Sequence, residues 1–347
     1  MRKLLVKISL ALIVAVMGVG GYYLYSIYHF TQQIQQPFKQ ASADSSQNDG
    51  SSGAAGEDNV ASSYKPPEWE GKERVNILVM GADGRNDESG RSDSMMVLSV
   101  DPVKKQGYLM SVLRDTYTEI PGYRSSRINT AFSVGGPELQ METTSKLLGI
   151  PIQFYLYTNF DGFMELVDQL GGIDIDVEKD MKYEDGGDHH VYDIDLKKGY
   201  QHLDGKSALQ YVRFRHDATS DFTRTERQRK FLKAVMNEVQ STSSLFKMPS
   251  LLNSIAPYIR TNMSTEDMLK LGTLAFKIPS SRIQGEQIPP NSLVKAETIQ
   301  GASVLTVDKK KLQAYVQELF EADLSQTSEK NADKADKADN SGSQDGR

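Results

Sequence analysis

Residues 221–239 carry hydrophobic positions with the period of a helix. The apolar stripe of this segment consists of Phe231, Leu232, Val235 and Val239. Extended backwards at about 100° per residue, the same face passes through Gln228, Arg224 and Asp221. Because an unpaired charge is costly to bury, this face predicts either a buried ion-pair network or the lining of a polar cleft.

Three largely apolar runs predict the first strands of a sheet. They are Val75–Met80, Ser94–Val100 and Gly107–Leu113. Short connections favour antiparallel neighbours, so the end of the first strand, the start of the second and the end of the third meet at one edge. That edge gathers Asp83, Arg85, Arg91, Asp93, Arg114 and Asp115.

The rest of the pattern interleaves helices with strands. Helices are predicted at Glu138–Leu148, Gly205–Tyr211, Phe222–Gln240, Leu251–Tyr258, Thr265–Phe276 and Lys309–Phe320, with a further one that takes Asp161 as its N-cap. Strands are predicted at Gln153–Tyr157, Ile173–Val177 and Gly301–Val307. This interleaving indicates an α/β fold in which helices cover a mixed central sheet.

An uncharged stretch at residues 8–28 stands apart from this domain. As a helix it spans roughly 30 Å, the thickness of a hydrocarbon core. Basic residues within 1–7 precede it and tyrosines fill its far end, which predicts a single-pass transmembrane signal anchor with residues 1–7 in the cytoplasm and the remaining chain outside the cell. The alternative is a cleaved signal peptide, but the small-residue site at 41–43 lies far downstream of the apolar core.

Two polar segments of low complexity flank the predicted domain. Residues 29–71 are rich in Ser, Gln, Gly, Ala and Asp, which is typical of a flexible tether between membrane and domain. Residues 325–347 contain a K-A-D-K-A-D run and indicate a disordered tail. The folded, extracellular domain is therefore predicted at 72–324.

Composition and charge exclude some classes of function. The 347-residue chain is 38% hydrophobic and 25% charged, with a formal net charge of −6. A nucleic-acid binder usually has a strong basic bias, so no nucleic-acid partner is expected. The chain has no cysteine, which excludes disulfides, thiolate metal sites and a cysteine nucleophile.

Asp83 and Asp93 flank a loop between the first two predicted strands. Carboxylates are hard oxygen ligands, and Mg²⁺ typically takes one or two of them together with waters and phosphate oxygens. The spacing by itself favours turn or capping roles for both residues, because Asp-Gly is a common turn dipeptide.

Arginines are the second candidate feature. Arg213 and Arg215 precede the helix that carries Arg224, and a guanidinium cannot lose its charge at physiological pH. Arginines that share a cleft are best explained by a phosphorylated, pyrophosphate-like ligand. The alternative is a structural Asp221–Arg224 pair. Further polar residues near strand ends are Arg114, Arg127 and Asn129.

Six segments, in this order, resemble the LytR-CpsA-Psr (LCP) family of Gram-positive cell-wall enzymes. They read N-I-L-V-M-G-A-D-G-R, R-S-D-S-M-M-V-L-S-V, S-V-L-R-D-T, R-I-N-T-A-F, L-V-D-Q-L-G-G-I-D-I-D-V and Y-V-R-F-R-H-D…D-F-T-R-T-E-R-Q. The resemblance covers about residues 75–239 and the anchor, and it is greatest to the Bacillus-type polyisoprenyl-teichoic acid–peptidoglycan teichoic acid transferases of that family. It implies an LCP-like α-β-α sandwich.

The resemblance also implies an activity and its site. A phosphotransferase would move teichoic acid, or a similar anionic glycopolymer, from a polyprenyl-pyrophosphate carrier to a muramic-acid hydroxyl of peptidoglycan beside the bilayer. Asp83 and Asp93 would hold Mg²⁺ or Mn²⁺. The pyrophosphate would contact Arg85, Arg91, Arg114, Arg127, Asn129, Arg213, Arg215, Arg224 and Gln228. Asp221 would orient an arginine or help to deprotonate the acceptor, with Arg114, Arg213 and Arg215 as the catalytic arginines.

Two other functions use the same residues. A polyprenyl-pyrophosphate hydrolase would use water as its acceptor. A non-catalytic, membrane-bound regulator of the cell envelope would bind the lipid without reaction. The predicted outward orientation of the domain argues against direct contact with DNA.

Overall fold

The computed structural model describes residues 2–35, 62, 64–82, 92–184, 192–215 and 221–322. Within these ranges, the side chains of residues 2–16, 19, 93 and 242–245 lie outside the description. The predicted tail at 325–347 also lies outside the described residues.

A six-stranded mixed sheet, in the order β11-β6-β1-β2-β3-β12, forms the centre of the domain. Its strands are β1 (Val75–Ala82), β2 (Ser92–Asp101), β3 (Gln106–Val112), β6 (Phe154–Asn159), β11 (Ile259–Thr261) and β12 (Ile283–Ile288). β2 is antiparallel to both β1 and β3, whereas β6 and β12 run parallel to their neighbours β1 and β3. The predicted meander of three strands is confirmed.

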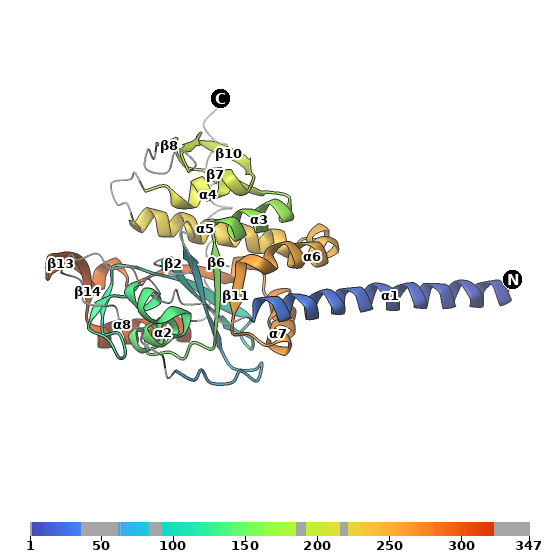
Figure 1. The fold of residues 1–347 in the computed structure, drawn as a ribbon, viewed down its shortest axis with the longest axis horizontal. Coiled ribbons are helices and arrows are strands. Elements are labelled where there is room, and N and C mark those ends of the chain that lie inside the picture. The colour runs from blue at the N-terminus through green and yellow to red at the C-terminus, as the bar shows by residue number, and fades with distance from the viewer. Residues whose placement is uncertain are drawn as a thin grey trace, which may run out of the picture.

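Helices cover both faces of the sheet because its central strands are apolar on both sides (Figure 1). On β1, Leu78 and Met80 pack in one core cluster with α2 (Thr130–Leu148) and α8 (Lys309–Glu321). Ile77 and Val79 face the opposite cluster, which includes α5 (Asp221–Val239) and α7 (Thr265–Ala275). The predicted mixed α/β fold is confirmed as three layers.

An outer group of elements packs against α5 and extends the domain away from the sheet (Figure 1). Its helices are α3 (Phe160–Leu170), α4 (Gly205–Arg213) and α6 (Thr242–Ile255). Its strand pairs are β7 (Ile173–Val177) with β10 (Gly199–Leu203), and β8 (Met181–Tyr183) with β9 (Ile194–Leu196). Smaller elements are β4 (Tyr117–Thr118), β5 (Ser126–Arg127), β13 (Val294–Ile299), β14 (Ala302–Val307), and three 3₁₀ turns at Ala256–Tyr258, Ser280–Arg282 and Asn291–Leu293.

The clearest local differences between prediction and structure concern α3, α2 and β12. The N-cap of α3 is Asn159, whose side chain accepts from the Gly162 amide, and Asp161 lies inside the first turn instead. α2 begins at Thr130, upstream of the predicted start at Glu138. It consists of two helical parts, and the chain kinks between them at Gly135 and Gly136. β12 was not predicted, because I-Q-G-E-Q-I is mostly polar and is an edge strand of the sheet.

The N-terminal helix α1 (Arg2–Ile34) projects away from the domain (Figure 1). It includes the whole predicted 8–28 span as helix. Within the described residues, none of the helices is both long and apolar enough to cross a membrane. The membrane role of residues 8–28 therefore stays a prediction.

Both ends of the predicted tether at 29–71 belong to the fold. α1 continues to Ile34, which is buried. Tyr64 donates its hydroxyl to the Ile152 carbonyl at 3.0 Å, and Trp69 is buried against Phe154. The described residues between these ends are Gln35 and Ser62 alone, so the central part of the tether stays a prediction.

Candidate active site

Two aspartates link three arginines into one chain of ion pairs. Asp221 lies 2.7 Å from Arg224 Nη2 and 3.9 Å from Arg114 Nε. Asp115 lies 3.6 Å from Arg114 Nε and 3.3 Å from Arg127 Nη1. These residues come from the end of β3, from β5 and from the first turn of α5. The structure thus joins four predicted site residues and adds Asp115, which the sequence placed only at the same edge.

Backbone hydrogen bonds explain why Arg114 points toward this chain. The Leu113 amide donates to the Ile288 carbonyl of β12 at 2.9 Å, and the Thr116 amide donates back to Leu113 at 3.0 Å. The resulting turn ends β3 and fixes the direction of Arg114. The Asn129 amide donates to the Arg114 carbonyl at 3.4 Å, which holds the segment after β5 against the same turn.

Arg213, at the end of α4, is held between two aromatic rings. Its guanidinium carbon lies 5.0 Å from the centre of the Phe160 ring and 4.9 Å from that of Tyr192. Its Nη1 donates to the Tyr192 carbonyl at 3.2 Å. Such stacking fixes the orientation of a guanidinium and retains its charge. Neither ring was identified from the sequence, because both lie far from Arg213 along the chain.

A cavity of about 460 Å³ lies between the sheet and α3, α4 and α5. Its polar lining includes Arg213, Arg215, Arg224 and Gln228. The rest of its wall is largely apolar and includes Val79, Met96, Leu156, Phe163, Leu166, Phe231 and Val235. Arg224 and Gln228 of the predicted polar face of α5 therefore line this cavity, and the Asp221–Arg224 pair is present as well. The arrangement suits an amphiphile with an anionic head and an apolar tail.

Polar contacts at the mouth hold Gln228 in place. The Ser94 hydroxyl donates to Gln228 Oε1 at 3.2 Å, and Gln228 Nε2 donates to the Val212 carbonyl at 3.3 Å. Asn129 is buried, and its Oδ1 has no hydrogen-bond partner among the described residues.

The predicted metal ligands are only partly described. Asp83, Arg85 and Arg91 lie outside the described residues. Asp93 belongs to β2 at a register shift: Gly81 pairs with Ser94 and Ala82 pairs with Ser92, so Asp93 is the extra residue of a bulge. Among the residues the structure describes, no group of three or more His, Asp or Glu side chains is placed to hold a metal ion.

A buried arginine that the sequence reasoning missed supports the mouth of the cavity. Arg227 is 3% exposed, and its Nη1 lies 3.2 Å from Glu178 Oε1. Its Nη2 donates to the Phe214 carbonyl, and its guanidinium carbon lies 5.3 Å from the Phe214 ring centre. Tyr211 donates its hydroxyl to Glu178 at 3.1 Å, and burial together with that carboxylate raises the pKa of Tyr211. Phe214 lies between Arg213 and Arg215 in the chain, so Arg227 holds the backbone next to both arginines.

The domain thus has three layers and a largely apolar cavity that arginines also line. The family model LytR_cpsA_psr matches residues 26–321. The chain belongs to the LytR_cpsA_psr family, as the six sequence segments predicted.

Two relatives with different names share similar identity with this chain. Regulatory protein MsrR of Staphylococcus aureus (strain COL) is 34% identical over 254 residues, covering 72% of this chain and 75% of the relative. The polyisoprenyl-teichoic acid–peptidoglycan teichoic acid transferase TagU of Bacillus cereus (strain AH820) is 34% identical over 276 residues, covering 78% of this chain and 82% of the relative.

A solved structure of TagT bound to LIIa-WTA has a similar fold. It superposes with a TM-score of 0.60 at 26% identity, covering 73% of this chain and 92% of TagT. The similarity confirms the mixed α/β architecture of the family.

Proposed function

We propose that this protein is a phosphotransferase that attaches a cell-wall glycopolymer to peptidoglycan. The donor would be the glycopolymer linked through pyrophosphate to a polyprenyl carrier, and the acceptor a muramic-acid hydroxyl. The observation that carries this proposal is a cavity that is lined both by Arg213, Arg215 and Arg224 and by many apolar side chains. Its relative TagU, a named teichoic acid transferase, supports teichoic acid as the polymer.

The reaction exchanges one phosphorus–oxygen bond for another. The acceptor hydroxyl oxygen bonds to the phosphorus that carries the glycopolymer, and the bond from that phosphorus to the bridging oxygen breaks. The leaving group is polyprenyl monophosphate, and the hydroxyl proton passes to solvent or to a nearby base. Phosphoryl transfer depends mainly on positioning and charge neutralisation, which fixed guanidiniums supply.

Asp221 acts in this proposal by orienting arginines. Its Oδ1 faces Arg224 at 2.7 Å and Arg114 at 3.9 Å, so its lone pairs are directed at guanidiniums. Arg224 is almost fully buried, and its ion pair with the Asp221 carboxylate offsets the cost of burying the guanidinium charge.

The metal and the cellular location complete the proposal. Asp83 and Asp93 would hold Mg²⁺ or Mn²⁺, which would supply positive charge to the pyrophosphate. The position of Asp93 supports this role. Asp93 is the extra residue of a bulge in β2, and the neighbouring strand β1 lines the cavity. α1 would anchor the domain to the outer side of the cell membrane, close to lipid-linked donors.

The decisive experiment uses purified full-length protein with a lipid-linked donor and peptidoglycan. Arg114→Ala and Arg213→Ala are expected to abolish formation of the polymer–glycan product. Arg124→Ala is the matched control, because Arg124 is an exposed arginine three positions before Arg127. Transfer at the wild-type rate by both site variants would refute the assignment.

The same assay separates transfer from hydrolysis and from regulation. A transferase forms polymer–glycan product only when peptidoglycan is present. A hydrolase releases the polymer phosphate without it. A lipid-binding regulator changes neither substrate, and in that case the arginine variants lose donor binding alone.

A further inference from the structure

The last turns of α1 pack against the domain along one side of the helix. The side chains on that side recur at intervals of three and four residues, as helical packing requires. They are buried or half-buried: Tyr23, Ser26, Ile27, Phe30, Thr31 and Ile34. At the rise of a helix, the packed length from the first to the last of them is roughly 17 Å.

Two hydrogen bonds join α1 to α6. The Tyr23 hydroxyl donates to the Phe246 carbonyl at 3.4 Å, and the Ser26 hydroxyl donates to the Pro249 carbonyl at 3.3 Å. From one bond to the other, both partners advance by three residues, so the two helices run side by side in the same direction. Phe246 therefore lies at the level of Tyr23 on α1.

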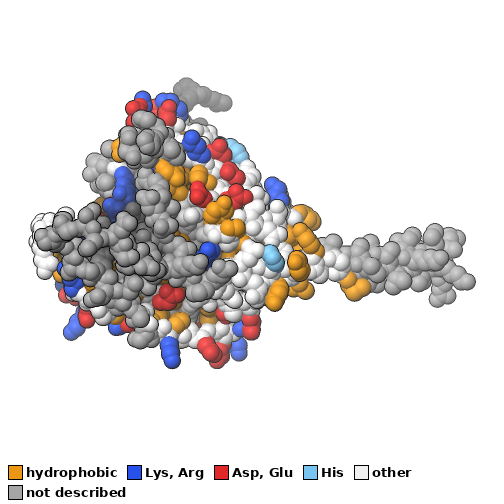
Figure 2. All heavy atoms as spheres, viewed as in Figure 1, with side chains coloured by type: hydrophobic (Ala, Val, Ile, Leu, Met, Phe, Trp, Pro, Cys, Tyr) orange, Lys and Arg blue, Asp and Glu red, His pale blue; other side chains and the backbone are white. Residues whose placement is uncertain are grey.

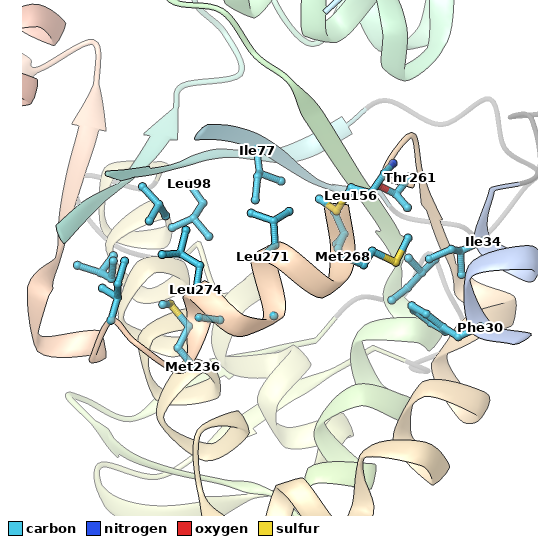
Figure 3. Close-up of a pocket in the computed structure, with 17 residues that line it drawn as sticks. Phe30, Ile34, Ile77, Leu98, Leu156, Met236, Thr261, Met268, Leu271 and Leu274 are labelled. Atoms are coloured by element: carbon cyan, nitrogen blue, oxygen red, sulfur yellow. The ribbon is translucent and has the colours of Figure 1, made fainter. Parts of the chain in front are cut away.

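Further contacts fix the end of α1 at the edge of the sheet. The Thr265 hydroxyl at the start of α7 donates to the Thr31 hydroxyl at 2.8 Å, and Gln35 Nε2 donates to the Met263 carbonyl at 2.7 Å. Phe30 and Ile34 are buried and line a second cavity, whose other walls include the sheet and α7 (Figure 3). The end of α1 is therefore a packed element of the domain.

The opposite side of α1 changes in character at His29. Exposed side chains before this residue are large and mostly aromatic: Tyr22, Leu24, Tyr25 and Tyr28. Those that follow are polar, as are His29 itself and Gln32. Tyrosine favours the boundary between a bilayer and water, because its ring is apolar and its hydroxyl is polar. The change in character marks the level at which such a boundary would give way to water.

α6 adds an exposed aromatic side chain at the level of these tyrosines. Phe246 is 78% exposed, although its carbonyl is bound to α1. Exposed hydrophobic side chains gather where α1 meets the domain (Figure 2). A contiguous apolar patch of this kind marks an interaction site. Because α1 is the proposed anchor, the partner that lies beside this patch is the bilayer.

Residues 36–61 connect two points of the same domain. Before them, Gln35 is bound to the Met263 carbonyl, and after them the Ser62 hydroxyl donates to Glu142 Oε2 at 2.8 Å. Glu142 belongs to α2, across the sheet from α7. A segment with both ends fixed on one body cannot set the distance of that body from the membrane.

We propose that the exposed aromatic side of α1 and Phe246 of α6 form one surface that rests in the headgroup layer of a phospholipid bilayer. This surface holds the domain at one height and orientation, and residues 36–61 are a loop that returns to the domain instead of the tether that the sequence pattern predicts. The arginine-lined cavity then stands at a set distance from the membrane. The inference rests on the proposed function for the insertion of α1 into the bilayer.

Quenching of fluorescence by lipids tests the contact directly. Trp69 is the only tryptophan of the chain, so Phe246→Trp in a Trp69→Phe background gives emission from one position. Val103→Trp in the same background is the matched control, because Val103 is 77% exposed. Its neighbour Lys104 donates to the Phe320 carbonyl of α8, on the side of the domain away from α1 (Figure 1). Full-length protein is placed in vesicles of phosphatidylglycerol and phosphatidylcholine, with or without bromine near the headgroup end of the acyl chains.

Brominated lipid is expected to quench most of the Phe246→Trp emission and little of the Val103→Trp emission. Adding Phe30→Ala and Ile34→Ala should remove that quenching, because α1 then loses its apolar contacts with the domain. Tyr23→Phe with Ser26→Ala, which removes only the hydrogen bonds to α6, is a milder second variant that should reduce the quenching. Gln32→Ala, on the exposed side of α1, is the control for both.

The role of residues 36–61 is tested by an insertion after Ser52. Adding about 20 Gly and Ser residues there should leave the Phe246→Trp quenching unchanged, whereas a longer flexible tether would let the domain move away from the bilayer. Loss of quenching on this insertion would overturn the inference.

Equal quenching at positions 246 and 103 in normally melting variants would also overturn it. A blue-shifted Phe246→Trp emission that bromine does not quench, and that disappears when the protein is diluted in lipid, would overturn it in favour of contact between copies of this chain. Protein that does not float with the vesicles has no anchor, which would contradict the inference as well. The measurement needs no substrate, so the expected quenching without any polymer–glycan product would refute the transferase and support the membrane surface.

Discussion

Arg227 and Glu178 form an ion pair, Nη1 to Oε1 at 3.2 Å, and Arg227 also donates to the carbonyl of Phe214. Phe214 stands between the two cavity arginines in the chain. A buried guanidinium whose N–H groups bond to fixed acceptors has little freedom to move. It therefore restrains the segment to which it is bonded. Arg227 is therefore a positioning residue for Arg213 and Arg215.

Replacing Arg227 by lysine should weaken catalysis more than donor binding. Lysine retains the charge but cannot bind Glu178 and Phe214 together, so we expect kcat to fall about ten- to hundredfold, the cost of a charged hydrogen bond. Steady-state transfer kinetics measure the change. Glu226→Gln, on an exposed face of α5, is the control. A wild-type kcat in Arg227→Lys would show that the clamp does not position the arginines.

Asp115→Asn should show that Asp115 acts by orienting arginines and not by strengthening donor binding. Asp115 holds Arg114 and Arg127, so its neutralisation should lower kcat about tenfold. KM for the lipid-linked donor should not rise, because the site becomes more positive. Asp101→Asn is the matched control, since Asp101 pairs with Arg74 at 3.2 Å at the other end of β2. If both variants alter kinetics equally, the effect is one of general stability.

Removal of divalent metal should abolish transfer if Asp83 and Asp93 hold Mg²⁺. Chelation followed by addition of Mg²⁺ should restore the activity of the wild-type protein, with Mn²⁺ as a substitute. The double variant Asp83→Ala, Asp93→Ala should remain inactive at all metal concentrations. Full Mg²⁺ dependence in the double variant would dismiss the metal role of this pair.

His202 should make stability depend on pH. Its Nδ1 lies 2.7 Å from Asp174 Oδ1 and its Nε2 lies 2.8 Å from the Gly171 carbonyl. The hydrogen bond to Asp174, and then that to Gly171, raise the pKa of His202, with smaller support from Glu238. A pKa raised in the folded state means stabilisation that is complete below the ordinary histidine value of about 6.5 and is lost as pH rises through the folded value.

Thermal unfolding of the wild-type protein and His202→Gln measures this contribution. The wild-type advantage should be larger at about pH 5.5 than at about pH 8.5. It should stay below about 1 kcal/mol, because the His202 and Asp174 side chains are 61% and 56% exposed and solvent screens them. Asp174→Asn should reduce the same pH dependence, with the hydrogen bond to the Gly171 carbonyl left in place. An advantage that grows with pH would contradict the assignment.

The contacts of Trp69 should make the segment before β1 unfold together with the rest of the domain. It is 5% exposed, and its Nε1 donates to the Glu73 carbonyl at 2.8 Å. Trp69→Ala should lower the free energy of unfolding by about 3 kcal/mol or more, and Trp69→Phe by about 1 kcal/mol through the lost hydrogen bond. Circular dichroism gives both values. An unchanged melting curve for Trp69→Ala would show that this segment does not unfold together with the domain.

The sequence by itself determined the layered α/β architecture and the polar face of α5. Apolar runs on β1, β2 and β3 require cover on both faces, and a charged face continuous with Phe231 and Val235 requires partners or a cleft. Both inferences rest on the spacing of apolar and charged residues along the chain. That spacing can be read without knowing what each element packs against.

Only the tertiary structure decided which distant groups meet. Asp115 between two arginines, the rings around Arg213 and the clamp of Arg227 on Phe214 depend on side-chain packing between separate elements. The edge strand β12 likewise exists because β3 offers an open edge, although its own residues are mostly polar. The second cavity, of about 330 Å³, has no sequence signal, because empty space arises from how α1, α7 and the sheet fail to fill the volume between them.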